Sequence, residues 1–123
     1  QRLLEGGYLD KLKKYNVEIH ARSIFLQGLL LMPLDSIHTW FNPILDALKI
    51  FHVEATIRNI STLQLALGFV QNIDEIDKIV IGVNTLKQLE EIINVSSMRI
   101  DVTELCKLSI NDPIYLNPSN WKI

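Results

Sequence analysis

The segment KIVIGV, residues 78–83, constrains the fold of this chain more than any other feature of its sequence. The apolar run Ile79–Ile81 is uninterrupted and lies between an acidic turn and a glycine. Such a run is typical of a parallel strand that is buried on both faces. A parallel strand needs a neighbouring strand and a crossover connection, and a helical pattern follows from Asn84 or Thr85. The sequence therefore predicts an α/β fold.

A second strand and several helices complete the expected order of elements. Alternating apolar and polar residues from Val17 to Arg22 predict a short strand that continues into the apolar segment SIFLQGLLL. A capping box of Ser61 and Gln64 predicts a helix over residues 62–71. Helical spacing predicts a helix with a glycine step in residues 1–16, two helices with a bend at Pro43 in residues 35–56, and a short helix in residues 102–108.

Two strands are too few to make a complete sheet. A chain of 123 residues can bury one modest core, and a parallel pair leaves two edges without hydrogen-bond partners. We therefore expect residues 1–123 to be a single partial domain that is completed by something outside this sequence. A homo-oligomer would complete it by pairing the open strand edges and an apolar stripe formed by Trp40, Phe41, Ile44 and Leu45.

The composition argues against several classes of partner. A net charge of −2 gives no electrostatic reason to expect nucleic acid or an anionic membrane. The longest apolar run, residues 24–34, is too short to span a bilayer, and the sequence shows no targeting segment. The single cysteine, Cys106, suits a reducing compartment, so the expected location is cytoplasmic. Ligand spacing is absent, so we expect no metal site at the three histidines, His20, His38 and His52.

The junction between the second strand and its helix carries the first sign of a ligand site. Gly82 allows a close approach to the backbone, and the amides of Asn84, Thr85 and Leu86 lie at the positive end of the helix dipole. This arrangement suits an anion such as a phosphate. An ordinary helix cap beside a buried loop is the alternative that these residues leave open.

Three blocks of sequence, in order along the chain, resemble one protein family. They are ARSIFLQGLLL, ISTLQLALGFV and IDKIVIGVNTLKQLEEI. The blocks resemble the C-terminal part of an aldo/keto reductase, an oxidoreductase built on a (β/α)8 barrel of the TIM type. The resemblance implies that residues 1–16 are helix 6 and residues 17–22 strand 7, and that helix 7, strand 8 at residues 78–82, helix 8 and a C-terminal tail follow. Because such a barrel needs roughly 250 residues, the chain would be a C-terminal fragment.

The resemblance also implies a cofactor, NADP, with NAD as the alternative. Loops after the last two barrel strands would hold it, the first along the pyrophosphate and the second around the adenosine 2′-phosphate and adenine. The implied cofactor-binding residues are Ser23, Phe25, Gln27 and Gly28 in the first loop and Gly82, Asn84, Gln88 and Glu91 in the second. The sequence departs from the family pattern at Arg22, where an aromatic residue often stacks on the nicotinamide, and at Asn84 and Ile92, where the family often has Arg and Asn.

The activity that the resemblance implies is reduction of an aldehyde or ketone to an alcohol with NAD(P)H. The tail INDPIYLNPSNWKI resembles the ends of reductases from bacterial surface-polysaccharide pathways, which implies a small, sugar-like carbonyl substrate. No motif here matches the family's catalytic Tyr, Lys, Asp and His, so we expect no catalytic residue in this chain and no activity of the chain alone. The alternative from another class is a non-catalytic α/β module that self-associates through its open sheet edges.

Overall fold

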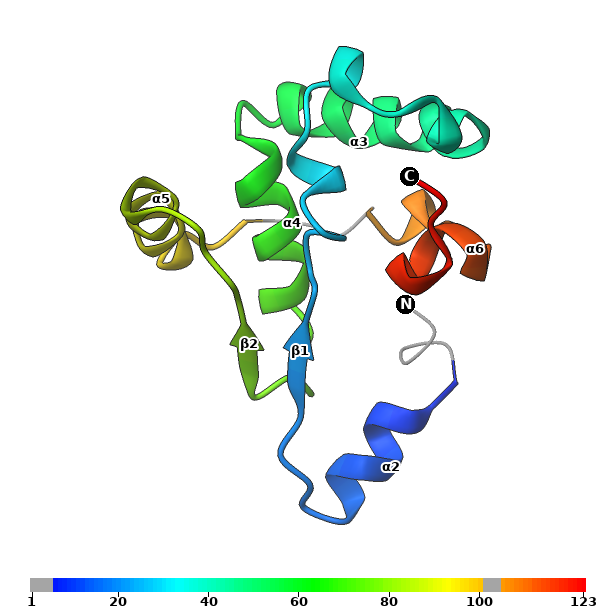
Figure 1. Ribbon diagram of the computed structural model, residues 1–123. Helices are drawn as coiled ribbons and strands as arrows, with labels where there is room; N and C mark the ends of the chain where they lie inside the picture. The colour runs from blue at the N-terminus through cyan, green and yellow to red at the C-terminus, as the bar shows by residue number, and fades with distance from the viewer. Residues whose placement is uncertain (1–5, 101–104) are drawn as a thin grey trace.

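The computed structural model describes residues 6–100 and 105–123, which form a mixed α/β fold around a small parallel sheet. The sheet consists of β1 (His20–Arg22) and β2 (Lys78–Val80), and it pairs Ala21 with Ile79 and Arg22 with Val80. Figure 1 shows the two strands side by side although almost sixty residues separate them in sequence. The predicted parallel pairing of these two segments is confirmed.

Helices occupy most of the remaining described residues. In Figure 1, α2 lies beyond the amino ends of the strands, whereas α3 and α5 lie toward their carboxyl ends. The expected helices in residues 1–16 and 102–108 fall partly on residues 1–5 and 101–104, outside the described residues. The α-helices are α2 (Tyr8–Lys14), α3 (Leu45–Ile57), α4 (Thr62–Gln71), α5 (Leu86–Ser96) and α6 (Pro113–Leu116), and the 3-10 helices are Leu29–Leu31, Leu34–Ser36, Thr39–Ile44, Leu105–Leu108 and Pro118–Asn120.

Local capping signals set where the helices begin. The Ser61 hydroxyl accepts a hydrogen bond from the Gln64 amide at 3.1 Å, and the Gln64 side chain accepts one from the Ser61 amide at 2.7 Å. This confirms the predicted capping box and the predicted span of α4. Helix α5 begins slightly later than expected, because Thr85 is its N-cap and accepts a hydrogen bond from the Gln88 amide at 3.2 Å.

Strand β1 is shorter than the sequence pattern predicts, at both ends. The Val17 amide donates to the Leu12 carbonyl at 3.1 Å, which keeps it attached to α2. The Ile19 amide donates to Asp77 Oδ2 at 2.7 Å rather than to a strand. After Arg22 the chain does not continue as a strand into SIFLQGLLL, because it turns and enters the 3-10 helix Leu29–Leu31.

The prediction that β2 is buried on both faces is wrong. Ile79 is half-buried, whereas Val80 keeps 53% of its surface exposed. Alternate residues of a strand point to opposite faces, so one face of the sheet is covered and the other is open. Within the described residues no layer covers the face that carries Val80, and its partner Arg22 is exposed as well.

Two residues of the apolar stripe that we expected at a subunit contact, Phe41 and Ile44, instead belong to the main core. Phe41 and Ile44 are buried together with Leu29 and Leu48, and the C-terminal tail covers them. Trp121 of the tail packs edge-on against Phe41 with 4.8 Å between ring centroids. Phe41 and Ile44 are therefore not available to a partner, whereas Trp40 and Leu45 are only half-buried. A smaller cluster of Ala55, Leu65 and Leu105 joins α3 and α4 to the 3-10 helix Leu105–Leu108.

A charged cluster holds the amino ends of the two strands to α2. Lys13 Nζ lies 2.6 Å from Asp77 Oδ1, and the other carboxylate oxygen of Asp77 accepts the Ile19 amide. The Lys13 ammonium, and after it the Ile19 amide, lower the pKa of the Asp77 carboxyl below its usual value. Beside them Glu18 pairs with Lys78 at 2.8 Å and contacts His20; the Lys78 ammonium, and after it His20, lower the pKa of the Glu18 carboxyl.

Candidate functional site

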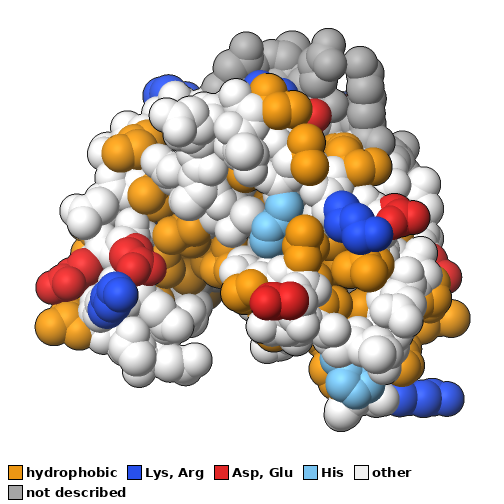
Figure 2. Space-filling model, turned by 90° about the horizontal axis from the view of Figure 1, so that it is seen from above, with side chains coloured by type: hydrophobic (Ala, Val, Ile, Leu, Met, Phe, Trp, Pro, Cys, Tyr) orange, Lys and Arg blue, Asp and Glu red, His pale blue; other side chains and the backbone are white. Residues whose placement is uncertain are grey.

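An open cleft of about 550 Å³ lies at the carboxyl ends of the two strands. It lies between the turn after β1 and the start of α5, and the view from above shows the surface hollowed beside α5 (Figure 2). All the residues that the resemblance implied for the cofactor line this one cleft: Ser23, Phe25, Gln27, Gly28, Gly82, Asn84, Gln88 and Glu91. The structure therefore brings together two sets of residues that are more than fifty positions apart in sequence.

Several apolar residues that the sequence did not suggest also line the cleft, among them Ile24, Leu31, Leu63 and Ile81. Leu63 is the least expected because it belongs to the first turn of α4. A crossover helix between parallel strands runs back along them, so it begins near their carboxyl ends. This rule, applied to the capping box that starts α4, would have placed Leu63 beside the cleft.

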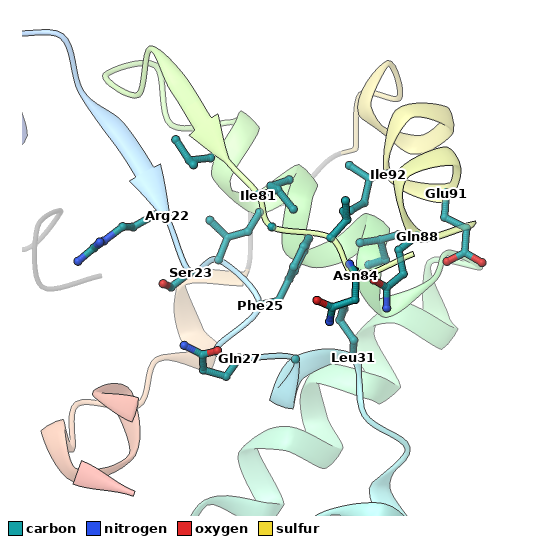
Figure 3. A pocket seen from close by; sticks show the side chains of 16 residues that line it. Arg22, Ser23, Phe25, Gln27, Leu31, Ile81, Asn84, Gln88, Glu91 and Ile92 are labelled. Carbon is teal, nitrogen blue, oxygen red and sulfur yellow. Dashed lines mark hydrogen bonds between the residues drawn. The ribbon is translucent and has the colours of Figure 1, made fainter. Parts of the chain in front are cut away.

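The turn after β1 has an unusual backbone. Ser23, Leu26 and Gln27 have φ angles of 58°, 46° and 56°, and Gly28 has a φ of 89°. Glycine adopts this left-handed region without strain, so the backbone conformation at residue 28 explains why that residue is glycine. Ser23, Leu26 and Gln27 have a Cβ atom and are strained in the same region. Figure 3 shows Ser23, Phe25 and Gln27 of this turn around the cleft.

The segment after β2 meets the turn from the other side of the cleft. The Asn84 amide donates to Gln88 Oε1 at 2.9 Å, so it is not free for an anion as we expected from the sequence. In Figure 3 the side chains of Asn84 and Gln88 lie next to each other. Gly82 is not in the left-handed region, and a Cβ atom built there meets nothing within 4 Å. Neither strain nor contact within the described residues therefore requires glycine at this position.

Unpaired peptide donors surround the cleft. The amides of Ile24, Phe25 and Gln27 after β1, and of Gly82 and Val83 after β2, make no hydrogen bond within the described residues. Unpaired N–H groups close together can bind an anion. The volume of the cleft also falls in the range of about 300–1,000 Å³ that is usual for small-molecule sites. The residues present therefore fit a ligand with several oxygen atoms.

The two charged side chains of the lining lie far apart. Arg22 lies at the end of the cleft opposite α5 and its side chain points away from the cleft, whereas Glu91 lies on α5 beyond Gln88 (Figure 3). Glu91 is 4.0 Å from Lys87, and Lys87 is not part of the lining. The α5 end thus offers amide and carboxylate groups but no cation in its lining, which suits a ribose hydroxyl better than a second phosphate.

A second cavity of about 520 Å³ adjoins the first at Gln27, which lines both. It lies between the segment before α3 and the C-terminal tail, and its other lining residues are Leu29, Met32, Ser36, His38, Phe41, Pro118, Trp121 and Ile123.

Two further features bear on the candidate functions. In the described part of the chain, no three His, Cys, Asp or Glu side chains are grouped so that they could hold a metal ion. The described helices are all too short or too polar to cross a membrane. Protein-family models and curated proteins were both compared with the chain, and neither comparison found a match.

Proposed function

We propose that the chain is the dinucleotide-binding part of an NAD(P)H-dependent oxidoreductase that reduces a carbonyl to an alcohol. The observation that supports this most is the convergence of eight residues from two segments on one cleft at the carboxyl ends of parallel strands. In barrels and other parallel α/β folds, ligands bind at this end of the strands. The proposed parent fold is the (β/α)8 barrel of the aldo/keto reductases.

In this proposal the free amides of the turn after β1 hold the pyrophosphate, and residues Gly82 to Glu91 hold the adenosine. The bound cofactor supplies a hydride to the carbonyl carbon of a sugar-like substrate. NADP is the cofactor that the resemblance implies. Because Glu91 is the one charged residue at the adenosine end of the lining, NADH should be tested beside NADPH.

The test is a titration of the chain with NADPH and with NADH, read from the fluorescence of the reduced nicotinamide. We expect a saturable change in emission with at least one of them. With NADPH, Asn84→Asp should weaken binding by at least about tenfold, because a carboxylate beside the adenosine 2′-phosphate costs more than the ~1.4 kcal/mol that a factor of ten represents. NADH has a hydroxyl in place of that phosphate, so the same substitution should not weaken NADH binding in this way.

Asn94→Asp is the matched control, since Asn94 is exposed on the same helix and does not line the cleft. The control should bind like the unmodified chain. No saturable signal with either nucleotide, or equal losses in both variants, would contradict the proposed site. The unmodified chain should also reduce no test aldehyde, and measurable turnover would contradict its assignment as a non-catalytic part.

A second candidate function is self-association through the open face of the sheet. Val80, the last residue of β2, leaves 53% of its surface exposed, and both strands have a free edge within the described residues. A second copy packed on this face would bury Val80, and pairing along a free strand edge would extend the hydrogen-bond ladder. This would be an interface of identical chains in the cytoplasm rather than an enzyme site.

Sedimentation at several concentrations tests this second candidate. We expect a concentration-dependent oligomer that Val80→Asp disrupts. Val53→Asp is the control, because Val53 is also 53% exposed but lies on α3. A monomer at all concentrations, or equal effects of the two substitutions, would argue against association through the sheet.

A further inference from the structure

The residues with a left-handed backbone conformation differ in type between the cleft and the rest of the described chain. Away from the cleft, the left-handed positions are Gly7, Asn16 and Asn59, with φ angles of 61°, 54° and 53°. Glycine and asparagine are the residues that tolerate this region best. In the turn beside the cleft, Leu26 and Gln27 occupy it instead, although both have side chains that disfavour it. Strain from unfavourable residue types is therefore concentrated at the cleft.

Three successive left-handed residues, Leu26 to Gly28, form one tight turn. L-residues in this conformation normally occur singly, so neighbouring contacts must hold the run in place. The Leu26 side chain packs against the main core, and the Leu26 carbonyl accepts the Leu29 amide at 3.0 Å. The Gly28 amide donates to the Phe25 carbonyl, also at 3.0 Å. Core burial on one side and these bonds on the other stabilise the strained conformation.

The turn places Gln27 where the two cavities meet. Gln27 is exposed, it lines both cavities, and its own amide makes no hydrogen bond within the described residues. We propose that the strained turn from Leu26 to Gly28 positions Gln27 at this junction so that its carboxamide contacts the bound ligand. The strained backbone lowers the stability of the fold. This inference rests on the proposed dinucleotide site.

Three substitutions test the proposal, each measured by urea unfolding at one protein concentration and by NADPH titration. Gln27→Gly should raise the ratio of folded to unfolded chain about threefold, because the lost left-handed strain outweighs the greater chain entropy of glycine. It should also weaken NADPH binding about tenfold. Gln27→Asn should keep most of the affinity, since asparagine retains a carboxamide and tolerates the left-handed region.

Asn59→Gly is the matched control, a left-handed position at the end of α3 and away from both cavities. It should change neither affinity nor stability appreciably. If Gln27→Gly is no more stable than the unmodified chain, the turn is not strained and the proposal is overturned. Normal NADPH affinity of Gln27→Gly would also overturn it. Failure of the unmodified chain to bind NADPH would instead contradict the proposed function itself, and the urea transitions would still decide whether the turn is strained.

Discussion

The two glycines of the cleft allow a direct measurement of backbone strain beside the site. Gly28 and Gly82 both line the cleft, and a Cβ atom built on either of them meets nothing within 4 Å. They differ in one respect, because Gly28 has a φ of 89° while Gly82 is outside the left-handed region. Substituting each by alanine therefore adds the same methyl group at both positions, and only Gly28→Ala introduces backbone strain.

The expected difference follows from these two facts. Alanine restricts the unfolded chain equally in both variants and thereby adds ~0.4–1 kcal/mol of stability where the native backbone accepts it. At Gly28 the left-handed penalty of ~1–2 kcal/mol opposes that gain. Gly82→Ala should thus be as stable as the unmodified chain or slightly more stable, and Gly28→Ala should be less stable than Gly82→Ala by about 1–2 kcal/mol.

Urea unfolding of the three proteins at one concentration measures this difference, provided that the dependence of the unfolding free energy on urea stays the same. Equal stability of the two variants would refute the assigned backbone conformation of Gly28. The NADPH titration adds a second readout, because the new methyl group of Gly82→Ala would occupy space in the cleft. We expect weaker binding without loss of stability, and unchanged binding would show that no ligand approaches the backbone at Gly82.

Three further substitutions test the packing and the charges of the fold. Leu65 has 0% exposure in the smaller core cluster. Leu65→Ala should lower the unfolding free energy by ~2–5 kcal/mol, measured by urea unfolding, and a loss below ~1 kcal/mol would contradict this burial. The pKa of the Asp77 carboxyl is lowered in the folded chain, so its ionised form stabilises the fold above the unfolded pKa near 3.8, and this stabilisation is lost as the pH falls through the folded pKa. Asp77→Asn should therefore reduce the fall in unfolding free energy below pH ~4, measured by acid titration. The same fall in the variant as in the unmodified chain would count against the Lys13 contact. His52 Nε2 is buried without a hydrogen-bond partner in the described residues. His52→Leu should therefore raise the unfolding free energy by about 1 kcal/mol, measured by urea unfolding. A clear loss of unfolding free energy would show that this nitrogen has a partner.

Much of the candidate site was predictable because its residues follow local rules. A strand that ends at a glycine and leads into a helix places Gly82, Asn84 and Gln88 at a carboxyl end, whatever the rest of the chain does. Leu63 was missed because its place depends on the direction of the crossover helix rather than on its neighbours in sequence. The bond from the Asn84 amide to Gln88 was also missed, since it depends on one side-chain rotamer.

The sequence by itself determined the helices with strong caps and the two strand segments, because caps and periodicity involve only a few neighbouring residues. The residues expected around the cleft were implied by the family resemblance. Only the tertiary structure decided that Val80 is exposed, that Phe41 is buried under Trp121, and that the turn at Leu26 is left-handed. These features depend on which distant surfaces meet, because burial and strain are set by contacts across the fold and not by the local residue pattern.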